Sequence, residues 1–180
     1  MPDEEQKRDS DRDIIEFRIL ETDENEDCRK RGYAAHIFIN RRDLVSILFE
    51  HEKEFARREG NPDDHYPAGG YKGLFPFVLL ENLGRTKDKV HEWRTEVLTC
   101  DSCGIRSCWS FELTIRYKIE RVIWTKFGNP HRGKNSNSHW DYANLGDFVF
   151  NYQQYHNALE KLEEQARRIW PDNNGPSRTA

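Results

Sequence analysis

Short runs of alternating hydrophobic and polar residues recur along this chain, and such alternation is typical of half-buried β-strands. The clearest run is 109–117, in which every odd-numbered residue is large and apolar and every even-numbered one is polar. This pattern indicates an antiparallel sheet with one face on the core and one face in water. Similar runs predict strands at 14–20, 33–39, 90–98, 122–127 and 147–150.

Two longer segments place their apolar residues at helical spacing. The first predicts a helix at 41–58, with Asn40 as its N-cap and Gly60 at its end. The second follows Asn151, which we expect to cap a helix that ends before Pro171. Its apolar stripe comprises Tyr155, Leu159, Leu162, Ala166 and Ile169.

The order of these elements indicates the fold class. Because strands cluster along the chain instead of alternating with helices, we predict an α+β fold in which an antiparallel β-sheet is packed against one face by two main helices. Residues 74–83 are apolar but contain Pro76, and they predict a short additional helix on the core. Residues 60–73 are rich in Gly, Pro and Asp and predict a loop.

Charge divides the chain into tails and a body. The net charge of the 180 residues is −4, whereas the first 31 residues alone carry 12 acidic and 7 basic side chains. Residues 1–13 lack the apolar side chains that would offset the entropy cost of ordering them. We therefore predict a disordered acidic tail at 1–13, a single domain at 14–170 and a disordered tail at 171–180. The chain lacks an apolar stretch of about 20 residues, so we expect a cytoplasmic protein without membrane contact.

Three of the four cysteines lie within nine residues, at Cys100, Cys103 and Cys108. A Cys-x-x-Cys turn can direct two thiolates at one tetrahedral zinc ion, and Cys108 supplies a third ligand. A structural zinc site needs a fourth, for which the candidates are Cys28, His91, His131 and His139. Two other interpretations stay open: a reduced cluster without metal, and a redox or nucleophilic role that requires a thiolate of lowered pKa.

A second cluster of candidate residues lies in a basic, aromatic segment. Residues 121–140 contain no Asp or Glu, and their mixture of cations and aromatic rings can bind phosphates and stack on bases. However, the chain outside the acidic N-terminal segment is nearly neutral, so we do not expect nucleic acid to be the main partner.

Four side chains of the same region could form a catalytic site: His131, Arg132, His139 and Asp141. A histidine and an aspartate can act as base and orienting carboxylate, and the arginine can bind an anionic substrate. Loop residues of these types more often hydrogen-bond the backbone in turns. A weaker cluster lies at Asp63, Asp64 and His65, and the common nucleotide-binding and hydrolase motifs are absent from the sequence.

Several blocks of residues carry a family resemblance. They are 39–40 with 55–60, 68–74, 103–109, and 124–132 with 141–142 and 148–155. In these blocks, the chain resembles an uncharacterised family of small bacterial proteins. The most specific parts of the resemblance are the motifs Cys-Gly-x-x-x-Cys-Trp and Phe-x-x-Pro-His-Arg. That family has one residue between its first two cysteines, whereas Asp101 and Ser102 stand there in this chain, which implies a different ligand geometry. The resemblance implies a single bacterial, cytoplasmic domain and no established activity.

These observations leave three functional classes. We expect a non-enzymatic protein-binding or regulatory domain, in which the cysteine turn is a structural element and the partner is a protein. The first alternative is a small enzyme that acts on an anionic substrate through residues 128–142. The second alternative is a weak nucleic-acid binder.

Overall fold

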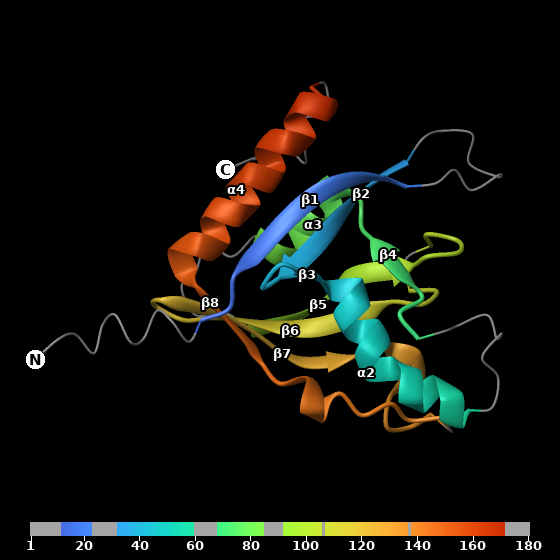
Figure 1. The fold of residues 1–180 in the computed structure, drawn as a ribbon. Coiled ribbons are helices and arrows are strands. Elements are labelled where there is room, and N and C mark those ends of the chain that lie inside the picture. The colour runs from blue at the N-terminus through green and yellow to red at the C-terminus, as the bar shows by residue number, and fades with distance from the viewer. Residues whose placement is uncertain are drawn as a thin grey trace, which may run out of the picture.

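The computed structural model describes residues 12–22, 32–59, 68–84, 92–105, 107–136 and 138–171. In this part of the chain, two antiparallel sheets contain eight strands (Figure 1). The first sheet has the order β1-β2-β3, with β1 at Ile15–Thr22, β2 at Gly32–Ile39 and β3 at Arg42–Asp43. The second has the order β4-β5-β6-β7-β8, with bounds Tyr71–Gly73, Glu92–Cys100, Phe111–Tyr117, Arg121–Gly128 and Phe148–Asn151.

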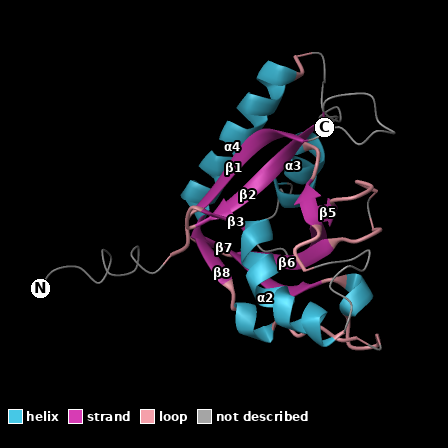
Figure 2. Ribbon diagram, turned by 45° about the vertical axis from the view of Figure 1, so that its right-hand side comes forward, coloured by secondary structure: helices cyan, strands magenta, loops and turns pink. Residues whose placement is uncertain are grey.

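Three α-helices pack against these sheets: α2 at Leu44–Arg58, α3 at Pro76–Gly84 and α4 at Tyr152–Ile169. Helix α4 lies along β1 and contacts α3 (Figures 1 and 2). Two short 3-10 helices, η1 at Pro130–Arg132 and η2 at Ala143–Leu145, interrupt the connection between β7 and β8. The predicted α+β class is confirmed, and the strands are divided between two sheets instead of forming one.

Two isolated bridges join the sheets to each other. The amide of Ala35 in β2 donates to the carbonyl of Leu74 at 2.8 Å, directly after β4. At the other end, Asp13 forms a parallel bridge with Phe150 of β8. Gly73 permits the first contact, because a Cβ at this position would lie 2.2 Å from the Ala35 carbonyl oxygen. The two sheets therefore enclose a common core.

The core confirms most of the predicted apolar positions. The odd-numbered residues of 109–117 are all buried, and so are the first four residues of the α4 stripe. Ile169, the last residue of that stripe, is 40% exposed. The predicted cap of this helix is also confirmed, because the Asn151 side chain accepts a hydrogen bond from the Gln154 amide. Within the described residues, no helix combines the length and apolarity that a membrane crossing requires.

The predicted start of the first long helix is wrong. Asn40 and Arg41 adopt positive φ angles of 51° and 68°, which turn the chain sharply. This turn lets β3 pair back onto β2, and helix α2 begins only after it, at Leu44. Its N-cap is Asp43, whose carboxylate accepts from the Val45 amide at 2.7 Å. A tight turn stabilised by strand pairing therefore replaces the expected first helical turn.

The predicted loop at 60–73 also needs correction at its end. Residues 71–73 form strand β4, because they pair with the last residues of β5 in the register Tyr71 to Cys100. Pro76 begins α3, where its missing N–H costs no helical hydrogen bond. Most of the two predicted tails and residues 60–67 lie outside the described residues. Asp13, which the sequence placed in the acidic tail, belongs to the fold through its bridge to Phe150.

Candidate metal centre and adjoining pocket

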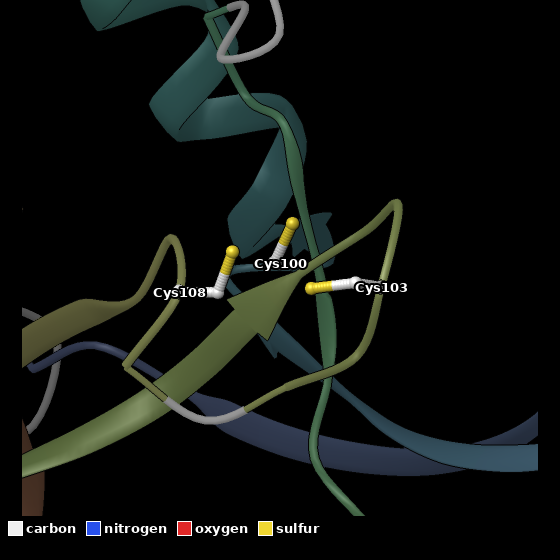
Figure 3. A group of neighbouring side chains, drawn as sticks. All are labelled: Cys100, Cys103 and Cys108. Atoms are coloured by element: carbon white, nitrogen blue, oxygen red, sulfur yellow. The ribbon is translucent and has the colours of Figure 1, made fainter.

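Three cysteine thiols meet in the connection between β5 and β6. Cys100 ends β5, while Cys103 and Cys108 lie in the loop that follows, and their sulfur atoms are all within 4.8 Å of one another. Figure 3 shows the three side chains directed toward a common space beside the end of the strand. Cys100 is buried, Cys108 is half-buried and Cys103 is exposed, so the group opens toward solvent on the Cys103 side.

The loop backbone holds these cysteines in place through local hydrogen bonds. The Gly104 amide donates to the Cys100 carbonyl at 3.0 Å, and the Cys108 amide donates to the Ile105 carbonyl at 3.2 Å. Gly104 has a φ of +64°, a conformation that glycine adopts without strain. The Ile105 amide donates to the Cys103 sulfur at 3.4 Å and, as the largest lowering effect, shifts the pKa of that thiol below its ordinary value. The turn therefore favours the thiolate form that metals bind.

The arrangement fits three of the four ligands of a tetrahedral zinc ion. With Zn–S bonds of about 2.3 Å, ligand sulfurs lie about 3.8 Å apart, which small side-chain rotations achieve from the separations present. Lys72 contributes a nearby positive charge, since a Cβ on Gly104 would lie 2.9 Å from its Nζ atom. An ammonium group beside this turn offsets part of the negative charge that thiolates would bring.

The fourth ligand is not found among the described residues. The only group of three or more metal-ligating side chains in that part of the chain consists of the three cysteines. His131 Nε2 lies 3.0 Å from the Ser107 carbonyl, and His139 Nδ1 lies 3.1 Å from the Arg132 carbonyl, so both candidate histidines contact backbone oxygens. The other two candidates, Cys28 and His91, lie outside the described residues.

The 129–142 loop is anchored to the end of α2 by an arginine between two tryptophans. The Arg132 guanidinium lies 4.9 Å from the ring centre of Trp109 and 5.3 Å from that of Trp140. Its Nε and Nη2 atoms donate to the two carboxylate oxygens of Glu59, each at 3.1 Å. Trp140 Nε1 donates to Glu59 at 2.5 Å. Because Trp109 directly follows Cys108, this loop also rests on the cysteine turn.

Three of the four predicted catalytic candidates line one pocket of about 570 Å³: Arg132, His139 and Asp141. His131 is not among the lining residues; its ring stacks on Trp109 at 5.8 Å. The Asp141 carboxylate accepts from the Ala143 amide at 2.9 Å, as a turn-forming aspartate does. The second candidate cluster, Asp63, Asp64 and His65, lies outside the described residues.

A buried carboxylate that the sequence interpretation missed lies between the pocket and the cysteine turn. Glu52 of α2 is fully buried and accepts hydrogen bonds from the Gly69 amide, the Tyr71 hydroxyl and the Tyr142 hydroxyl at 2.7–2.8 Å. Asn129 Nδ2 donates to the Tyr71 hydroxyl at 3.0 Å. We call Glu52, Tyr71, Asn129 and Tyr142 the Glu52 cluster.

Burial determines the chemistry of this cluster. Because water no longer solvates the carboxylate, the pKa of Glu52 rises to about 7, although its three hydrogen bonds act in the opposite direction. The same burial raises the pKa of the Tyr71 and Tyr142 hydroxyls. The helical spacing could have indicated that Glu52 is buried, because Glu52 follows the buried Leu44 and Leu48 at intervals of four residues.

Comparison of the chain with protein-family models, with curated proteins and with solved structures found no match. The resemblance to a bacterial family therefore stays a prediction. The fold and the thiol geometry define the chain as an α+β protein with a three-cysteine cluster that could hold a metal ion.

Proposed function

We propose that this chain is a non-enzymatic, zinc-stabilised domain of the cytoplasm that recognises a protein partner. The observation that carries the proposal is the convergence of Cys100, Cys103 and Cys108 within 4.8 Å. Thiolates prefer zinc and other thiophilic ions over magnesium or calcium, and they must be reduced to bind them. A reducing compartment such as the cytoplasm keeps them in that state.

The partner-binding part of the proposal rests on the residue displayed by the cysteine turn. Ile105 lies between Cys103 and Cys108, and it is 64% exposed although it is large and apolar. Its backbone is held on both sides, since its carbonyl accepts from the Thr99 hydroxyl at 3.0 Å and its amide donates to a cysteine sulfur. An exposed apolar side chain on a hydrogen-bonded backbone costs less backbone entropy to order on binding, which favours protein recognition. Zinc bound to the cysteines would restrict the backbone around Ile105 further.

Metal analysis tests the zinc site. Protein produced without a histidine tag and purified in reductant should contain about one zinc ion per chain. Cys103→Ser and Cys108→Ser should each lower the zinc content below about 0.2 per chain, because two thiolates hold zinc much less tightly than three. Ser102→Ala lies in the same turn, keeps every thiol and should retain the metal. Reduced wild-type protein with less than about 0.2 zinc per chain refutes the site.

A matched pair of surface variants tests the partner. Ile105→Asp replaces the apolar residue of the cysteine turn, and Ile119→Asp replaces one that is 84% exposed in the turn between β6 and β7. Cross-linking in the native host, followed by mass spectrometry, should give a protein that wild type and Ile119→Asp capture. Ile105→Asp and Cys103→Ser should lose it. Identical captured sets for all four proteins would contradict recognition through the cysteine turn.

A further inference from the structure

The pocket beside the 129–142 loop gathers cationic side chains in a chain whose net charge is −4. Arg94 and Lys126 lie in its wall from β5 and β7, and Arg132 and Lys134 come from the loop. Its volume of about 570 Å³ is in the range of small-molecule sites. The three cysteines are not among its lining residues, so this pocket is separate from the proposed metal centre.

Arg94 is fixed in orientation and keeps one donor group available. Its Nε donates to Glu112 at 2.7 Å, and its Nη1 donates to the Lys126 carbonyl at 2.8 Å. Its Nη2 has no hydrogen-bond partner among the described residues and lies over Gly128, where a Cβ would be 3.3 Å away. The guanidinium therefore presents a free N–H edge at the pocket without the entropy cost of being positioned on binding.

The position of the Lys126 carbonyl, which accepts the hydrogen bond from Arg94, depends on a bulge in the sheet. The pairing of β6 with β7 shifts register between Glu112 and Thr114, and Lys126 in the bulge has a φ of +52°. A non-glycine residue in this region is strained, and β-bulges commonly redirect groups beside binding sites. Here the bulge supports the pocket wall through the Lys126 carbonyl.

The other cationic side chains of the pocket differ in whether a carboxylate already pairs with them. Glu59 neutralises Arg132, and Glu92 pairs with the Lys126 ammonium at 2.8 Å. In contrast, Lys134 and the Nε2 atom of His139 make no hydrogen bond to the described residues. Two donor groups thus stay available from two different segments: Arg94 Nη2 from β5 and Lys134 Nζ from the loop. His139 instead uses its Nδ1–H toward the Arg132 carbonyl.

We propose that this pocket binds a small phosphate ester. A terminal phosphate carries three acceptor oxygens, and the guanidinium and the ammonium can each donate to one of them. The Phe127 ring gives an apolar surface for the organic part, and the carboxylates of Asp141 and Asp147 provide acceptors for its hydroxyl groups. The proposal goes beyond the function proposed above and does not depend on metal binding.

Isothermal titration calorimetry with the full chain at low ionic strength tests this proposal, with ribose 5-phosphate, inorganic phosphate and ribose as probes. Both phosphates should bind saturably with dissociation constants below about 10 mM, ribose 5-phosphate more tightly, and ribose should not bind. Failure of both phosphates to bind in this range, or equal binding of ribose, overturns the proposal.

Two arginine variants locate the binding. Arg94→Gln should weaken ribose 5-phosphate binding at least about tenfold, which corresponds to about 1.4 kcal/mol. The control is Arg116→Gln, because Arg116 also forms an ion pair on the sheet surface, with Glu92 at 2.6 Å, but does not line the pocket. It should bind within about twofold of wild type. Equal effects of the two substitutions place the ligand elsewhere and overturn the assignment, and circular dichroism of each variant verifies its fold.

Discussion

The cysteine turn of residues 100–108 and the Glu52 cluster adjoin the same strand but differ in how their polar groups are satisfied. Tyr71 links them, because its backbone pairs with Cys100 and its hydroxyl donates to Glu52. At Glu52, both carboxylate oxygens accept hydrogen bonds from within the protein. At the cysteine turn, three sulfurs lie beside solvent within 4.8 Å of one another, an arrangement that could hold a metal ion.

This difference separates a group that holds the fold together from a group that can bind a ligand. A buried carboxylate that accepts three internal hydrogen bonds holds its neighbours in place, and its removal leaves their donors unpaired. Thiols gathered near solvent have few internal partners to lose, and they gain their interactions when an ion arrives. We therefore expect substitutions in the Glu52 cluster to change stability and substitutions in the cysteine turn to change metal content.

The largest expected effect comes from Glu52→Ala. The change leaves the hydroxyls of Tyr71 and Tyr142 and the Gly69 amide without their acceptor, and it opens a cavity in the core. Each unsatisfied buried donor costs about 1–3 kcal/mol, so the free energy of unfolding should fall by roughly 4 kcal/mol or more in urea titrations. Glu50→Ala on the exposed side of the same helix should change it by less than about 0.5 kcal/mol. Similar losses in both variants would contradict a structural role for the cluster.

The second prediction concerns pH. The carboxyl pKa is 4.5 ordinarily and about 7 in the folded protein, so the folded state binds more protons than the unfolded state between these values. The free energy of unfolding should therefore decrease as pH rises from about 4.5 to about 7, by up to about 3 kcal/mol at about 1.4 kcal/mol per pKa unit.

Urea titrations of wild type and Glu52→Gln across this range measure the effect. The difference between their two pH profiles isolates Glu52, because the other titrating groups are common to both. Glutamine carries no titrating proton, so its profile should lack the decrease. Parallel profiles would show that Glu52 is not the group responsible.

The cysteine turn was predictable from the sequence and the Glu52 cluster was not, for a physical reason. Cys100, Cys103 and Cys108 are close along the chain, so their spacing alone indicates a common site. The partners of Glu52 come from positions 17 to 90 residues away, and only the tertiary fold brings them together. The fold shows the same limit: local periodicity predicted the long strands and α4, whereas the two-residue β3 and the three-residue β4 exist only through pairing.

Metal binding should have the third-largest effect on stability. Zinc at 100 times its dissociation constant stabilises the folded state by about 2.7 kcal/mol, provided that the unfolded chain binds it weakly. For a domain of this size, that corresponds to a rise in melting temperature of roughly 5–10 °C in reducing buffer. A chelator should reverse the rise, and Cys103→Ser should not show it. An equal response of Glu52→Gln and wild type would confirm that the two regions act independently, whereas a rise in Cys103→Ser would place the metal elsewhere.

The smallest effect is expected at Arg132, in the loop that packs beside the cysteine turn. Its guanidinium binds both oxygens of Glu59 and lies between Trp109 and Trp140, and both members of the ion pair are mostly buried, with side-chain exposures of 20% and 24%. Lysine keeps the charge but cannot bind bidentately or stack, so Arg132→Lys should lower the free energy of unfolding by about 1–2 kcal/mol.

Tryptophan fluorescence during urea unfolding measures this loss, because the rings of Trp109 and Trp140 both contact the Arg132 guanidinium. The control is Arg57→Lys, since Arg57 pairs with Glu54 at 2.9 Å with 78% of its side chain exposed. That exchange should change the free energy of unfolding by less than about 0.5 kcal/mol. Equal changes in the two variants would mean that stacking and bidentate pairing add nothing at Arg132. The loop would then be held to α2 by other contacts, such as the hydrogen bonds of Trp140 to Glu59 and of Tyr142 to Glu52.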